Sequence, residues 1–238
     1  MNPGRSFQAR QTGFTLFELL VVVGLIAATS FLLAGGLGDG GKSAALQSSQ
    51  ATVANLVTSA RLRASATGRK VRLLVNVDPG QPERYLRCVV LQLGRQPGAS
   101  PAEWDTVREV FLPVGIYVVP GSLDGLVGDP SVWKRVSDTT AELVSDLFIN
   151  QSLVYAVEGD VTPQLWTGVA FTPNGTLAAL AGGPPPKGAW VIAGGQPRAA
   201  GSYAAGQPPV QLGEPPRVRG VMLSAYGVPA LLGDRNAF

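Results

Sequence analysis

Hydrophobic positions near the start of the chain form one long, almost uninterrupted run. From Phe14 to Leu33 the residues are mostly apolar, and Glu18 carries the only charge. A helix of about 20 such residues is about 30 Å long, which matches the hydrocarbon core of a membrane. We therefore predict a transmembrane helix over residues 14–34. A lone carboxylate inside it costs roughly 2.5–3.5 kcal/mol on insertion, so Glu18 needs an explanation.

A glycine-rich stretch, "AGGLGDGGKS", follows this run. Each glycine weakens a helix by roughly 1 kcal/mol relative to alanine, so we expect a break or a partly unwound joint over residues 35–42. Residues 36–43 also fit the phosphate-binding loop G-x-x-x-x-G-K-S, in which Lys42 would reach phosphate and Ser43 magnesium. Such a loop normally follows a strand, whereas this one follows an apolar helix, so nucleotide binding is the weaker interpretation.

The next segment has the periodicity of an amphipathic helix. Ser43 is a candidate amino-terminal cap, and Gly68 is a typical residue to end the helix. We expect the apolar face to lie against a sheet. Its residues recur at helical spacing and are Leu46, Val53, Leu56, Val57 and Ala60.

Beyond Gly68 the apolar residues recur with period two, which is typical of strands. The segment from Asp138 to Leu147 favours a short helix, and the Gly/Pro-rich residues 194–216 favour a long surface loop. This order predicts an α+β fold in which the amphipathic helix packs on a mostly antiparallel sheet. The predicted strands lie at 69–77, at 84–93, on both sides of Pro113 within 106–121, in a hairpin at 168–180, at 188–195, and around Tyr226 and Gly227.

Composition excludes several kinds of active site. The 238 residues are 45% hydrophobic, which is enough for one domain and an anchor. There is no histidine, so Ser–His–Asp and Cys–His chemistry is excluded. Cys88 is the only cysteine, so it forms neither an intrachain disulfide nor a thiolate cluster, and we expect it to be buried in a strand. We predict no enzymatic activity, no cofactor and no metal site.

The sequence "GFTLFELLVVVGLIAA", residues 13–28, combines a glycine, Phe-Thr-Leu, a glutamate and an apolar run. It resembles the class III leader junction of type IV pilins and type II secretion pseudopilins. The resemblance implies cleavage after Gly13 by a membrane prepilin peptidase and N-methylation of Phe14. It also implies that Glu18 pairs with the amino group of a neighbouring subunit's Phe14, which offsets the cost of a carboxylate in a low dielectric. An ordinary secretory signal or membrane anchor leaves Glu18 unexplained.

Basic residues before the span, Arg5 and Arg10, predict a cytoplasmic amino terminus and an extracytoplasmic, periplasmic domain. The resemblance implies an inner-membrane location before assembly and a filament afterwards. It implies three kinds of partner: a prepilin peptidase, other pilins or pseudopilins through the amino-terminal helix, and an inner-membrane assembly platform. The predicted organisation is a leader at 1–13, a transmembrane or filament-core helix at 14–34, a joint at 35–42, and a globular domain at 43–238 that contains the loop at 194–216.

Three stretches of the globular part are similar to minor pseudopilins, in particular to the H-type subunit of type II secretion. They are "ARLRASATGRKVRLLV", "VAFTPNGTL" and "RGVMLSAYGVPALL". The resemblance implies a minor subunit of a type II secretion pseudopilus or a type IV pilus, whose role is assembly.

Basic residues raise an alternative, a DNA-binding or adhesive minor pilin. Loss of Arg5 and Arg10 with the leader lowers the 19 basic residues to 17, against 16 acidic ones. That small excess argues against general DNA affinity, and a solvated helix end explains basic residues equally well. The candidate DNA-binding residues are Arg61, Arg63, Arg69, Lys70, Arg72, Arg217 and Arg219.

Overall fold

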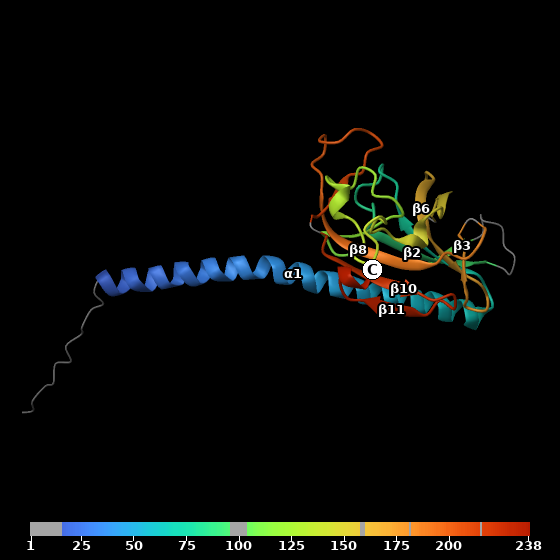
Figure 1. Ribbon diagram of the computed structural model, residues 1–238, viewed down its shortest axis with the longest axis horizontal. Coiled ribbons are helices and arrows are strands. Elements are labelled where there is room, and N and C mark those ends of the chain that lie inside the picture. The colour runs from blue at the N-terminus through green and yellow to red at the C-terminus, as the bar shows by residue number, and fades with distance from the viewer. Residues whose placement is uncertain (1–15, 96–103, 158–159, 181, 215) are drawn as a thin grey trace, which may run out of the picture. The chain divides into compact units, whose positions relative to one another are not determined.

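The first element is a long helix, α1, which extends from Leu16 to Thr67 (Figure 1). The prediction of a break at 35–42 was wrong, because α1 is helical throughout that stretch. Glycine weakens a helix, but it neither removes the backbone N–H nor clashes as proline does. Good helix formers flank the glycines, so helix can extend from both sides without a new, costly nucleation step.

The computed structural model describes most of the chain, and the predicted cleavage and methylation sites, Gly13 and Phe14, lie outside the described part. The side chains of Glu18 and of residues 28–40 are also outside it. The chain divides into two units, Met1–Gly41 and Lys42–Phe238. The described residues are 16–95, 104–157, 160–180, 182–214 and 216–238.

Among the helical residues that the structure describes, no stretch has both the length and the apolar character needed to cross a membrane. Part of the predicted span at 14–34 lies outside the described part of the chain. Phe14 lies outside it, and so do the side chains of Glu18 and of residues 28–34.

The carboxyl-terminal part of α1 forms the predicted amphipathic helix. Its predicted apolar face is confirmed, since all five of those side chains are buried: Leu46, Val53, Leu56, Val57 and Ala60. The helix ends at Thr67, and Gly68 follows with φ of 64°, a left-handed conformation that glycine adopts without strain. Ser43 lies inside α1 and does not cap it.

Two antiparallel sheets complete an α+β fold. The first has the strand order β3-β2-β1-β6-β5, and β7 also pairs with β6. We call it sheet A. Its strands are β1 (Val71–Asn76), β2 (Cys88–Gly94), β3 (Trp104–Phe111), β5 (Ser152–Tyr155), β6 (Gln164–Phe171) and β7 (Leu177–Ala178).

The second sheet, sheet B, has the order β11-β10-β8-β4, and β9 also pairs with β8. Three short 3-10 helices are η1 (Pro130–Val132), η2 (Asp146–Phe148) and η3 (Arg235–Ala237). The strands of sheet B are β4 (Ile116–Val118), β8 (Gly188–Pro197), β9 (Val210–Leu212), β10 (Val218–Leu223) and β11 (Pro229–Leu232).

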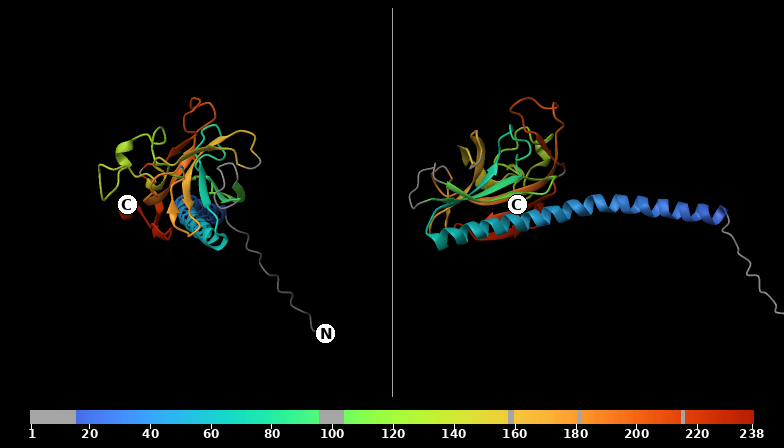
Figure 2. Two further views of the ribbon diagram at one scale, coloured as in Figure 1. Left: turned by 90° about the vertical axis from the view of Figure 1, so that its right-hand side faces the viewer. Right: turned by 180° about the vertical axis from the view of Figure 1, so that it is seen from behind.

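The helix α1 and the two sheets contribute residues to one apolar core. Val53 and Val57 of α1 belong to the same buried cluster as Leu73 of sheet A and Trp190 of sheet B. Figure 2 shows the carboxyl-terminal part of α1 beside β10 and β11. Gln50 of α1 joins them: its Nε2 donates to the carbonyl oxygens of Gly220 and Leu232, both at 2.7 Å.

One predicted element was wrong and another was correct only in part. The segment 138–147 is not an α-helix; Asp138 instead accepts hydrogen bonds from the backbone N–H and the hydroxyl of Thr140, which closes a local turn. The loop predicted at 194–216 is a loop at 198–209 but includes two strand segments, because Gly195–Pro197 pair with Val210–Leu212. A Cβ at Gly195 would lie 2.9 Å from a backbone oxygen of the facing strand and would clash with it. The absence of a side chain at this position therefore permits the pairing.

Candidate functional site

The predicted assembly residue, Glu18, lies in the first turn of α1, two residues after its described start at Leu16. Apolar side chains surround it along the sequence. Leu16 is 83% exposed and Phe17 is 75% exposed, and Leu19 and Leu20 are exposed as well. These large apolar side chains of the helix are therefore not buried by other residues of the unit Met1–Gly41.

The candidate DNA-binding residues fall into separate groups. Arg61 and Arg63 are on the last turns of α1, where Arg63 is exposed and Arg61 is half-buried. The Cγ atom of Arg61 lies beside the turn of the β6–β7 hairpin, 3.2 Å from the position that a Cβ on Gly175 would occupy. These two residues belong to the contact between helix and hairpin as much as to the surface.

Arg69 and Lys70 lead into β1. Arg69 Nε donates to the carbonyl oxygen of Gly94 at 2.5 Å, and its Nη2 lies 3.6 Å from Asp105. Lys70 is exposed. Arg69 therefore already has an acidic partner and a backbone acceptor within the domain.

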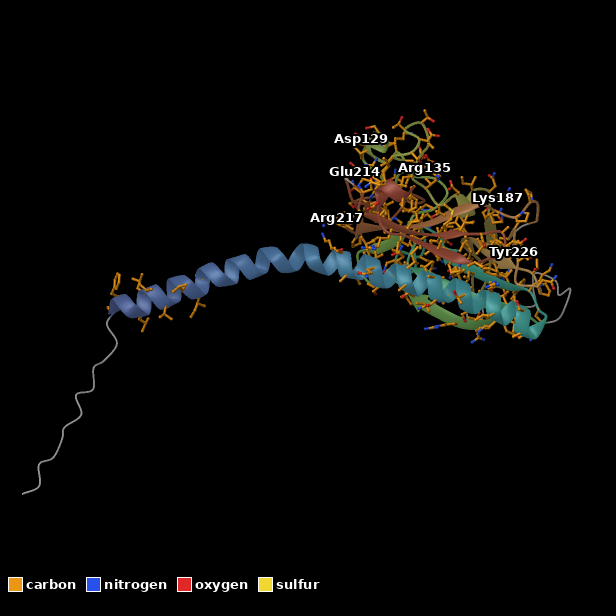
Figure 3. The ribbon with its side chains drawn as sticks, turned by 60° about the horizontal axis from the view of Figure 1, so that its bottom comes forward. Asp129, Arg135, Lys187, Glu214, Arg217 and Tyr226 are labelled. Atoms are coloured by element: carbon orange, nitrogen blue, oxygen red, sulfur yellow. The ribbon has the colours of Figure 1, made fainter. Side chains whose placement is uncertain are left out.

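Of the remaining pair, Arg219 lies on β10 and Arg217 directly precedes that strand. Figure 3 shows Arg217 at one end of this strand and Tyr226 beyond its other end. Arg219 Nη1 donates to Gln50 Oε1 at 3.4 Å. Gln50 and Arg61 are separated by about 17 Å of helix at 1.5 Å per residue, so the residues on β10 and those at the end of α1 do not form one basic surface.

Arg72 is the residue that departs most from the predicted role. It is only 3% exposed, so it is not part of a surface that could follow a nucleic-acid backbone. Its neighbours Val71 and Leu73 point into the core with α1, and Arg72 points to the opposite face of β1 because side chains alternate along a strand. There its Cζ lies 4.2 Å from the ring centroid of Trp104 and 4.4 Å from that of Tyr155.

The guanidinium of Arg72 is held between two aromatic rings and has few polar partners. Its Nε donates to Gln92 Oε1 at 2.7 Å, while its Nη2 is buried and has no hydrogen-bond acceptor. Burial lowers the pKa of Arg72 to about 10, and Tyr155 partly opposes this change. The side chain therefore remains cationic at neutral pH, and stacking on the rings compensates for part of the lost hydration.

The sequence contained a signal for this arrangement. Arg72 is the only charged residue in the apolar strand "VRLLVN", and a charge inside a fully buried strand requires a partner. Three of the tryptophans, Trp133, Trp166 and Trp190, are buried, whereas Trp104 is half-buried and covers the guanidinium. The identity of the partner could not be predicted, because Trp104 and Arg72 come from strands that are not adjacent in sheet A.

A second polar cluster on the same face was not anticipated. Arg84 forms ion pairs with Asp160 at 2.7 Å and with Glu109 at 3.1 Å. The thiol of Cys88 donates to Glu109, and burial raises its pKa well above the usual range. Cys88 is buried in β2, as predicted, and is therefore a structural residue rather than a reactive thiol.

The alternative phosphate loop does not have the required geometry. Residues 36–43 lie inside α1, whereas a phosphate loop leads from a strand into a helix. Across the described residues, no group of three or more His, Cys, Asp or Glu side chains could hold a metal ion.

Comparisons with known proteins give no assignment. The sequence matches no protein-family model, and no curated protein and no solved structure is similar to the chain at a significant level.

Proposed function

We propose that the chain is a prepilin-like minor subunit, which is processed by a prepilin peptidase and assembled into a type II secretion pseudopilus or a type IV pilus. The observation that carries the proposal is "GFTLFELLVVVGLIAA", in which Gly13 precedes an apolar run and Glu18 lies in the first described turn of α1. The exposed side chains of Leu16, Phe17, Leu19 and Leu20 support it, because such a helix needs lipid or other helices around it.

In this proposal the residues at 14–34 anchor the subunit in the inner membrane, with the domain outside the cytoplasm. Cleavage after Gly13 creates a new amino group on Phe14. Glu18 then pairs with that group on a neighbouring subunit when the helix moves from lipid into the filament. A paired carboxylate is tolerated in a low dielectric, and the pair fixes the register between apolar helices that otherwise slide past each other.

The experiment is co-expression with a prepilin peptidase in a host that assembles the filament. We expect the mature chain to begin with N-methylated Phe14, as read by mass spectrometry of the amino-terminal peptide. Glu18→Ala should still be inserted and cleaved but should be depleted from sheared filaments by about tenfold or more, because one buried ion pair is lost.

A matched control is Glu83→Ala, which removes an exposed acid of the globular domain and should leave incorporation unchanged. A chain that keeps its first residues in the presence of active peptidase would refute the proposal. Normal incorporation of Glu18→Ala would refute the pairing role alone.

A further inference from the structure

One face of sheet A contains a cavity of about 540 Å³, which is within the size range of small-molecule sites. Lys70, Arg72 and Trp104 form its polar and aromatic part. Leu153, Ala170 and Leu180 belong to its apolar part. None of the described residues that line it is acidic.

Arg72 is a buried cation that has no anionic partner among the residues that the structure describes. Among the described residues, no carboxylate forms an ion pair with it, and Nη2 has no acceptor. Buried charges in proteins are nearly always paired, because an unpaired donor or charge loses its hydration without compensation. The two stacked rings attract the faces of the guanidinium, and the Tyr155 side chain also opposes the lowering of its pKa, but Nη2 is left without an acceptor.

A second unpaired donor lies at the same cavity. Trp104 Nε1 is buried and has no acceptor, and the Trp104 ring covers one face of Arg72. Lys70 adds an exposed ammonium group from the same strand end. Two orphan N–H donors, one buried cation and one exposed cation therefore surround an otherwise largely apolar space.

We propose that this cavity binds a small monocarboxylate that carries an apolar substituent. The carboxylate would accept from Arg72 and Trp104, and the apolar substituent would lie against Leu153, Ala170 and Leu180. A single buried guanidinium matches a singly charged anion. The apolar lining disfavours a sugar–phosphate group, which would lose more hydration than these donors replace. This inference does not depend on the proposed filament function.

Two sources supply this chemistry: a free carboxylic acid with an aliphatic chain, and the terminal carboxylate of a peptide with an apolar last residue. Both orphan nitrogens are covered in the chain without ligand, so a carboxylate has to shift the Trp104 indole to reach them. Tryptophan fluorescence is therefore expected to change on binding.

The test is isothermal titration calorimetry of the full-length chain in mild detergent with two matched pairs of probes. Hexanoate is compared with hexanamide, and N-acetyl-leucine is compared with N-acetyl-leucine amide. We expect at least one carboxylate to bind about tenfold or more tightly than its neutral amide, since charge-assisted hydrogen bonds are about twice as strong as neutral ones. The pair with the larger ratio identifies the source.

Three variants distinguish an effect on the binding site from an effect on folding. Lys70→Gln changes an exposed side chain and should weaken carboxylate binding a few-fold without affecting folding. Trp104→Phe keeps the stacking ring but removes the N–H, and Arg72→Gln removes the charge; both should abolish the preference for carboxylate. Arg63→Gln, an exposed arginine of α1, is the control and should bind as the wild type does.

Equal binding of acid and amide would overturn the proposal, as would the absence of heat with all four probes at 10 mM, on the order of the weakest useful affinity. In either case the rings alone satisfy Arg72. A carboxylate preference that persists in Trp104→Phe and Arg72→Gln would also place the anion elsewhere and overturn this assignment.

Discussion

Replacement of Gln50 by alanine should destabilise the globular unit far more than its place on a helix suggests. The side chain is almost completely buried, and its amide donates to two backbone carbonyls, those of Gly220 and Leu232, at 2.7 Å. Each hydrogen bond contributes about 1 kcal/mol net, and each carbonyl left buried without a donor adds a further cost of about 1–3 kcal/mol where no water reaches it. Since Leu232 is only partly buried, the further cost falls mainly on the carbonyl of Gly220, and we expect a total loss of about 3–5 kcal/mol.

The assay is urea unfolding of the full-length chain, followed by tryptophan fluorescence. All four tryptophans belong to the unit Lys42–Phe238, so the signal reports on the unit that contains Gln50. Gln50→Met separates the loss of hydrogen bonds from the loss of packing, because methionine fills similar space but donates no hydrogen bond. We expect Gln50→Met to show most of the destabilisation that Gln50→Ala shows.

Gln47→Ala is the matched control. Gln47 is one turn earlier on the same helix and exposed, so its loss should change stability by no more than about 0.5 kcal/mol. The reasoning fails if Gln50→Ala behaves like Gln47→Ala, or if Gln50→Met restores wild-type stability.

Two further predictions concern the turn of the β6–β7 hairpin and a buried phenol. Gly175→Ala should cost about 1–3 kcal/mol in urea unfolding, because φ is 75° and the new Cβ would lie 2.5 Å from Ser65 Oγ; Gly201→Ala, with φ of 83° and open space around it, should cost less. Burial raises the pKa of Tyr85 to about 12, so the folded state favours the neutral phenol. Stability from this group is complete below pH 10 and declines towards pH 12. Tyr85→Phe should reduce that decline in unfolding free energy, whereas Tyr226→Phe, at a side chain 71% exposed, should not.

The amphipathic helix, the main strands and both hairpins were accessible from the sequence, because their signals are local. Alternating apolar residues marked β1 and β8, and glycines with positive φ at Gly175 and Gly227 marked the two turns. The start of β2 was predicted too early: residues before Cys88 form hydrogen-bonded turns, and Leu86 has φ of 55°. Such local hydrogen bonding competes with strand pairing but has no distinct hydrophobic period.

What the sequence could not supply was pairing between distant segments. The division into two sheets depends on β4 joining β8, although β3 and β4 are separated by only four residues. The environment of Arg72 depends on Trp104 and Tyr155, which approach it from separate strands. Neither contact has a periodicity or a motif, and the basic cluster inferred from spacing around Arg72 was misleading for that reason.

The hydrogen bonds of Gln50 join residues that are 170 and 182 positions apart. At a synthesis rate of about 5–20 residues per second, roughly 9–36 s separate the appearance of Gln50 from that of its strand partners. Throughout that interval the apolar stripe of Val53, Leu56 and Val57 lacks the core residues that β10 provides, Val221 and Leu223. A nascent chain of this topology is therefore prone to aggregation during most of its translation. Its yield in a cell depends on a chaperone or another partner that covers this stripe until the final hairpin has been synthesised.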